Sequence, residues 1–154
     1  MDSMKGRSCR NNLLFYGIPE RDNETWEDCE NDVREIIKEK LQIEGADDND
    51  KIGIERAHRL ATSPAKGPRP IIVKFLSYKV RSNILMTGRK IFKKTELSVK
   101  EDFPPLIRAT RKKLRPYLTD AIDDDKKAYL SYDKLVIDGE RFKYDDVIND
   151  IRKL

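Results

Sequence analysis

Residues 10–20 read "RNNLLFYGIPE", a basic and polar start followed by an apolar run that stops at a glycine and a proline. An apolar, aromatic run closed by turn residues predicts a β-strand. Leu13 and Phe15 would lie on one face of that strand, and Leu14 and Tyr16 on the other. The sequence by itself leaves open which of the two faces is buried.

Helix and strand patterns alternate along the segments that follow. Helical spacing over residues 25–43 predicts an amphipathic helix, with Thr25 and Asp28 in a capping arrangement. Its expected buried stripe is Trp26, Cys29, Val33, Ile36 and Ile37. Three further strands are predicted, over residues 51–60, 69–78 and 95–103. A second helix, capped by Ser77, is expected over 78–91, with a buried stripe of Val80, Ile84, Leu85 and Ile91.

The resulting order is strand, helix, strand, strand, helix, strand. This is the split βαβ, ferredoxin-like arrangement, in which two helices cover one face of four antiparallel strands. The stretch that opens the chain would supply a central strand. In RNA recognition motifs, the uncovered face carries aromatic and basic groups and binds nucleic acid. We therefore predict an α+β fold with three parts: a flexible tail over 1–9, a recognition-motif-like domain over 10–103, and a small α+β C-terminal domain over 104–154.

The C-terminal domain begins after two prolines and reads as a helix over 106–122. Pro116 is expected to kink this helix, because proline removes one amide hydrogen bond and presses on the carbonyl four residues back. Asp138 and Gly139 predict a tight β-hairpin. Residues 146–154 read as a closing helix. In the first domain, residues 61–70 are expected to form a mobile basic loop.

Charge is strongly segregated along the chain, although the net charge is only +4. Residues 20–50 hold 13 acids and 4 bases, whereas residues 51–118 hold 18 bases and 4 acids. A basic face of this strength attracts polyanions. A solvated surface whose acidic and basic blocks pair with each other is the alternative.

Enzyme signatures are weak. The single histidine, His58, stands near two arginines and is more typical of a surface or stacking group than of a general base. The sequence has no glycine-rich phosphate loop, serine elbow or zinc-ligand spacing, so we expect neither catalysis nor a cofactor. Cys9 and Cys29 suggest no disulfide framework or metal site. No apolar run has the length of a membrane helix and no signal peptide opens the chain, so we expect an intracellular or nuclear protein.

Basic and aromatic side chains are the candidate binding groups. Four bases of the helix over 106–122 recur at i, i+3, i+4 and i+7 and therefore share one face: Arg108, Arg111, Lys112 and Arg115. Arginine suits phosphate because its planar fork donates two parallel hydrogen bonds. Further candidates are Arg56, Arg59, Lys74 and Tyr132. Four aromatic residues have two possible roles, stacking on unpaired bases or packing in the core: Phe15, Phe75, Tyr78 and Tyr132. For Phe75, packing in the core is favoured.

Six segments together resemble the first-open-reading-frame protein of LINE-type retrotransposons, over about residues 10–145: "RNNLLFYGIPE", "IIKEKL", "IERAHRL", "PRPIIVKF", "NILMTGRKI" and "RKKLRPYL…LSYDKLVIDGERFKY". The resemblance implies a noncanonical RNA recognition motif followed by a small C-terminal domain. It implies binding of single-stranded RNA and DNA in a cleft between the two, nucleic-acid chaperone activity, and a cytoplasmic ribonucleoprotein particle, with the nucleus as a second compartment. The RNA-contacting bases that it implies are Arg69, Arg89, Arg111 and Lys112.

Two features depart from that pattern. Ending the recognition-motif signature at Phe75 puts Pro70 and Ile72 at the usual aromatic positions, so phosphate contacts should dominate over base stacking. No heptad-bearing segment precedes Cys9, so we expect a homotrimer only if the natural chain has an upstream coiled coil. Two other functions stay open: a protein–protein interaction module with a recognition-motif fold, and a nuclease that uses the aspartates of 120–125.

Overall fold

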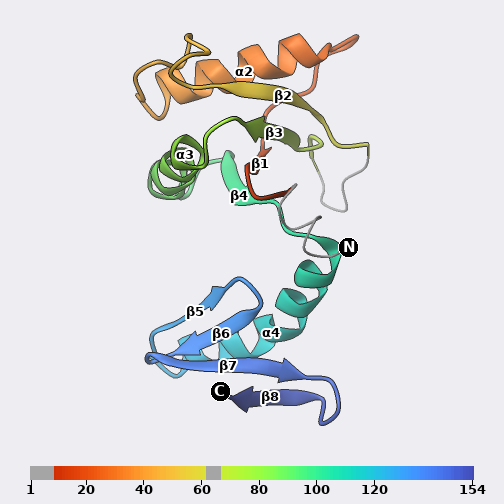
Figure 1. The fold of residues 1–154 in the computed structure, drawn as a ribbon, viewed down its shortest axis with the longest axis vertical. Helices are drawn as coiled ribbons and strands as arrows, with labels where there is room; N and C mark the ends of the chain where they lie inside the picture. The colour runs from red at the N-terminus through yellow and green to blue at the C-terminus, as the bar shows by residue number, and fades with distance from the viewer. Residues whose placement is uncertain (1–8, 62–66) are drawn as a thin grey trace. The chain divides into compact units, whose positions relative to one another are not determined.

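The computed structural model describes residues 9–61 and 67–154. Residues 1–8 of the predicted tail over 1–9 and residues 62–66 of the predicted loop over 61–70 lie outside these residues. The chain divides into two compact units, the first ending at Asp102 and the second running from Phe103 to Leu154 (Figure 1).

The first unit contains a four-stranded antiparallel sheet with the strand order β2-β3-β1-β4. Its elements follow the predicted order: β1 (Asn12–Tyr16), α2 (Trp26–Glu39), β2 (Ile54–Arg59), β3 (Ile71–Phe75), α3 (Tyr78–Ile91) and β4 (Ser98–Glu101). The opening stretch forms β1, which pairs with β3 on one side and β4 on the other. The predicted central position of this strand is therefore confirmed.

The core of the first unit lies on one face of this sheet. Leu13 and Phe15 of β1 are fully buried there, and Val73 of β3 lies opposite Leu13. Helix α2 contributes Val33 and α3 contributes Ile84 to the same apolar cluster. Both helices therefore pack on the face that carries Leu13 and Phe15, and α2 follows the edge strand β2 in Figure 1. The tertiary structure thus decides the question that the alternating pattern of β1 left open.

Both predicted helix caps are present. Thr25 accepts a hydrogen bond from the amide of Asp28, whose carboxylate accepts one from the amide of Thr25, so the capping box is complete. Ser77 caps α3 by accepting from the amide of Val80. These interactions satisfy amides that have no partner within the helix.

Two members of the predicted buried stripes are exposed. Trp26, in the first turn of α2, is 63% exposed, and its ring lies against the edge strand instead of entering the core. Ile91, the last residue of α3, is 50% exposed, and Phe92 is buried in its place. In both cases helical spacing assigns the buried face correctly along the middle of the helix and fails at the residue where the helix begins or ends.

The second unit packs one long helix against an antiparallel sheet of strand order β5-β6-β7-β8. Its elements are α4 (Pro105–Asp123), β5 (Ala128–Ser131), β6 (Lys134–Ile137), β7 (Glu140–Asp145) and β8 (Asp150–Lys153). Leu114 and Ala121 of α4 are buried, as are Leu135 and Val136 of β6. The predicted hairpin is confirmed, with Asp138 and Gly139 both at positive φ.

The predicted closing helix is wrong. Residues 150–153 form β8, which pairs with β7 through a turn in which Asn149 has a positive φ. Val147 and Ile148 are exposed in this turn. Their spacing to later apolar residues fits a helix, but pairing with the free edge of β7 satisfies the backbone of this segment instead. Helix α4 continues through Pro116 to Asp123, so the expected kink does not end the helix.

Candidate nucleic-acid interface

The face of the first sheet away from the helices carries basic groups from three strands. The register places Arg56 of β2 opposite Lys74 of β3, and Leu14 of β1 opposite Lys100 of β4. Arg56 and Lys100 are exposed, and Lys74 is half-buried in an ion pair of 3.0 Å with Glu55. These cations can attract phosphate without any base-specific contact.

Aromatic groups contribute little to this face. Phe15 and Phe75 are buried in the core, so of the two readings left open for them, core packing is the one that the structure supports. Ile72 occupies the outer face opposite Leu14. Tyr16 is the aromatic residue of β1 on this side, and the ammonium of Lys100 lies 5.1 Å from its ring centroid. Base stacking across the middle of the sheet is therefore limited.

Arg59 belongs to the fold and not to an open binding surface. Its guanidinium pairs with Glu24 at 2.8 Å, and both side chains are 7% exposed. It also donates to the carbonyls of Ile18, Pro19 and Arg69. With a second bond to Glu24, from Nη2 at 3.2 Å, these bonds occupy all its donors and tie the end of β2 to the segment after β1. The same pairing lowers the pKa of Glu24. We therefore remove Arg59 from the candidate interface.

Arg69 is accessible but paired. Its side chain is 44% exposed and donates to Glu20 through Nε at 3.0 Å and Nη2 at 2.8 Å. This hydrogen bonding lowers the pKa of Glu20 and raises that of Arg69. Solvent screens an exposed ion pair of this kind, so it is weak. A phosphate can therefore compete with Glu20 for the guanidinium.

Glu101 of β4 joins two arginines of α3. Arg81 donates to its carboxylate at 3.0 Å and is buried, whereas Arg89 donates at 3.1 Å and is 56% exposed. Arg81 therefore holds the helix against the sheet. Arg89 extends into solvent, where it can exchange its share of Glu101 for a phosphate.

Helix α4 carries the predicted basic face. Arg108, Lys112 and Arg115 are exposed, and Arg111 is half-buried. Leu114 is fully buried on another side of the same helix, so the basic face is separate from the buried one. Among the described residues of the second unit, the three exposed bases take part in no ion pair.

Arg111 links this basic face to two aromatic rings. Its guanidinium carbon lies 4.3 Å from the ring centroid of Phe103, and Nη1 donates to the carbonyl of Tyr132 at 2.8 Å. Phe103 and Tyr132 meet edge to face at 5.9 Å between centroids. Tyr132 is 49% exposed and has a φ of +52°, which is unusual for an aromatic residue. The cluster of Phe103, Arg111 and Tyr132 thus combines a cation with an exposed ring.

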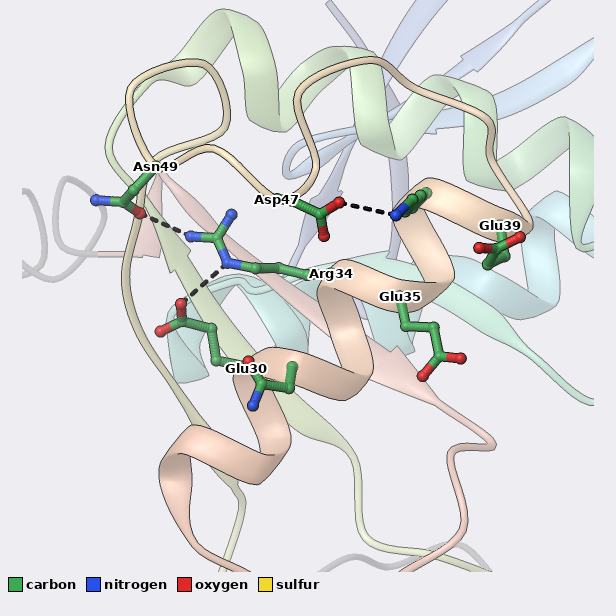
Figure 2. Close-up of a pocket in the computed structure, with 8 residues that line it drawn as sticks. Glu30, Arg34, Glu35, Glu39, Asp47 and Asn49 are labelled. Atoms are coloured by element: carbon green, nitrogen blue, oxygen red, sulfur yellow. Dashed lines mark hydrogen bonds and ion pairs between the residues drawn. The ribbon is translucent and has the colours of Figure 1, made fainter.

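Acidic side chains gather on the solvent-facing side of α2. Figure 2 shows a hollow between α2 and the loop 45–50, with Glu35 and Glu39 on the helix beside the ion pair of Lys38 with Asp47. Arg34 points inward here and donates to Glu30, Asn49 and the carbonyls of Ala46 and Ile52. Because carboxylates dominate its rim, this hollow repels phosphate. Arg34 thereby holds the loop 45–50 against the helix.

The described residues contain no group of three or more histidine, cysteine, aspartate or glutamate side chains that could hold a metal ion. None of the helices in the described part of the chain combines the length and apolar composition that crossing a bilayer requires.

Sequence reasoning missed two groups in the first unit. Trp26 was expected in the core, yet its ring lies on that of His58, with 4.6 Å between centroids. The guanidinium carbon of Arg10 lies 4.3 Å from the ring centroid of Tyr78, which is 42% exposed. The position of Trp26 in the first helical turn, directly after its cap residue Thr25, was the available signal that its side chain lies outside the core.

Comparison with known proteins now assigns the chain. A search of curated proteins found no match. The family model of the L1 transposable element RBD-like domain matches residues 10–103, which is more than half of the chain and includes the elements from β1 to β4. The chain therefore belongs to the family defined by the L1 transposable element RBD-like domain.

Proposed function

We propose that this protein binds single-stranded RNA and DNA with little sequence preference and acts as a nucleic-acid chaperone in a retrotransposon ribonucleoprotein particle. The observation that carries the proposal is the basic face of α4, with Arg108, Lys112 and Arg115 exposed beside the cluster of Phe103, Arg111 and Tyr132. We also infer that the first unit is a ferredoxin-like recognition motif, which its strand order β2-β3-β1-β4 supports.

The spacing of the α4 bases supports binding to a phosphate backbone. Three exposed cations on one helical face present a row of donors, and neutralising each phosphate releases condensed counterions. The partly exposed ring of Tyr132 offers a face to an unpaired base, which a duplex does not provide. In the first unit, Arg56, Lys74 and Arg89 supply further cations, and Arg69 completes the set that the resemblance implies.

Sequence tolerance follows from the kind of contact. Cations that bind phosphate read no base edges, and an aromatic ring accepts the face of any base. Binding that prefers unpaired strands and exchanges easily favours rearrangement of base pairs, which is the activity of a chaperone. The predicted groove shared by the two domains stays a prediction.

We propose a binding protein and not an enzyme, because the sequence offers no catalytic constellation. We assign it to cytoplasmic ribonucleoprotein particles, with the nucleus as a second compartment. A homotrimer is proposed only for a natural chain that carries an upstream coiled coil.

The test removes three charges from α4. The triple variant Arg108→Ala, Lys112→Ala, Arg115→Ala should bind a single-stranded RNA oligonucleotide more weakly at every sequence tried. The slope of log affinity against log salt should become shallower by about 2, because each lost phosphate contact removes roughly 0.7 from the slope for single strands. Fluorescence anisotropy across a salt series measures both quantities.

A matched control removes the same charge from the same unit but away from this face: Lys126→Ala, Lys127→Ala, Arg141→Ala, all three exposed. It should retain most of the wild-type slope. Equal loss in the two triple variants would mean that net charge alone attracts RNA. Unchanged RNA affinity in the α4 variant, with circular dichroism intact, would favour the alternative of a protein–protein interaction module.

A further inference from the structure

Trp26 is the most exposed large ring in the first unit. It is the sole tryptophan of the chain and is 63% exposed, although it belongs to an amphipathic helix. Its capping residue and the helix that follows are well formed, so the exposure does not come from a frayed end. An exposed indole ring offers a large, flat apolar surface that a planar partner can cover.

One face of this ring already has a support. The imidazole of His58 lies 4.6 Å from it, at 31° between planes. Nδ1 of His58 is 3.2 Å from the carbonyl of Arg59, and since a carbonyl only accepts, Nδ1 carries the proton and donates. The guanidinium of Arg59 pairs with Glu24 and donates hydrogen bonds to three backbone carbonyls. The pair of rings therefore adjoins a residue whose side chain is fixed by hydrogen bonds and an ion pair.

A hollow of about 320 Å³ adjoins the indole ring and contains a phosphate-binding group. Arg69, which is 44% exposed, lines it together with Trp26. The hollow holds three arginines against two carboxylates, Glu20 and Glu24, and both carboxylates are paired with arginines. An aromatic face beside an accessible guanidinium matches one nucleotide: the base stacks while the arginine contacts its phosphate.

We propose that Trp26, supported by His58, is a stacking platform for one unpaired nucleobase of the single strand whose phosphate is bound by Arg69. This inference rests on the proposed function and names a site that the family match does not specify. It also places base stacking at the edge of the sheet. Stacking there does not require aromatic residues at the centre of the sheet, where this chain lacks them.

The lone tryptophan makes the platform directly observable. Addition of a single-stranded uridine or thymidine oligonucleotide to the full chain should quench the fluorescence of Trp26, because the base stacks on the indole ring. An abasic strand of the same length and charge should bind without comparable quenching. Saturating binding of the normal oligonucleotide with unchanged tryptophan fluorescence would overturn the platform.

Substitutions separate stacking from charge. Trp26→Ala should weaken binding roughly 5- to 100-fold at all salt concentrations with an unchanged salt slope, because stacking releases no counterions. Arg69→Ala should instead make the slope shallower. Trp26→Phe should restore most of the affinity. Tyr129→Ala is the matched control, since this ring is 59% exposed and lies in the second unit, and it should bind like the wild type.

Different experimental results would overturn this inference and the proposed function. If the wild-type chain binds no single strand, the proposed function falls. If the wild type binds normally and Trp26→Ala binds equally well with an unchanged melting temperature, only the platform falls, and the indole ring is then assigned to contact with another protein.

Discussion

Single residues in this chain divide into those that hold the fold and those left for a ligand. Arg59 and Arg34 direct their donors inward to carbonyls and carboxylates, and both are largely buried. Arg69 and Arg89 instead pair with carboxylates at the surface, where solvent screens the attraction. All four look alike in the sequence. The number of protein partners separates them, because a guanidinium with every donor occupied has none left for phosphate.

A substitution at Tyr132 tests whether this residue, which has a strained backbone angle, binds RNA. Its φ of +52° suits asparagine better than tyrosine, since a side chain at this angle crowds the following carbonyl. Tyr132→Asn should therefore leave the melting temperature nearly unchanged, as relief of the backbone offsets the lost contact with Phe103. RNA affinity should fall about 5-fold or more if the ring stacks on a base. Thermal unfolding and anisotropy measure the two effects.

The control for this substitution is Tyr129→Thr, which removes a ring of similar exposure from an extended strand. It should leave RNA affinity unchanged. A Tyr132→Asn variant that is stable and binds normally would contradict the assignment of Tyr132 to the interface.

At the scale of elements, the contact between α3 and β4 depends on one glycine. A Cβ atom added to Gly88 would lie 2.4 Å from Cγ1 of Val99. Helix propensity alone predicts that Gly88→Ala stabilises α3 by about 1 kcal/mol. The close approach reverses the sign, and we expect the free energy of unfolding to fall by about 1–3 kcal/mol. Urea denaturation measures the change.

Lys90→Ala on the same helix is exposed and should change the free energy of unfolding by less than about 0.5 kcal/mol. A more stable Gly88→Ala variant would show that α3 can move away from β4. It would then also loosen the position of Arg89, which shares Glu101 of that strand with Arg81.

At the scale of the whole molecule, charge and topology act together. The acidic block of residues 20–50 contains α2 and the loop behind it, whereas the basic block of 51–118 contains most of the first sheet, α3 and the exposed face of α4. Segregation in sequence therefore becomes segregation among elements. A molecule with this distribution attracts phosphate to some surfaces and repels it from others.

Comparison of a single strand with a duplex of equal length tests this distribution. Both should bind more weakly as salt rises, because both release counterions. The single strand should keep an affinity advantage at high salt, since stacking on exposed rings does not depend on ion release. Titrations from low to high salt give a line of log affinity against log salt for the single strand and another for the duplex. Coincident lines would mean that the protein recognises charge alone.

Local patterns in the sequence were enough for most elements of the first unit and for one hairpin of the second. Alternation in β1 and β3, the capping residues Thr25 and Ser77, and the turn at Asp138 each act over a few residues, so they can be recognised without the rest of the chain. The basic face of α4 is equally local, because helical geometry alone aligns its bases. The resemblance over residues 10–145 added the family, which the match to 10–103 confirms.

Other features depend on which segments meet in space. Whether Leu13 and Phe15 or Leu14 and Tyr16 face the core depends on where α2 and α3 pack. Trp26 left its predicted stripe because its ring packs on His58 of the edge strand β2, and residues 150–153 became a strand because β7 offered an open edge. Sequence periodicity decides which residues share a face of an element. Only the tertiary structure decides what that face meets, because burial and pairing depend on segments far away in the chain.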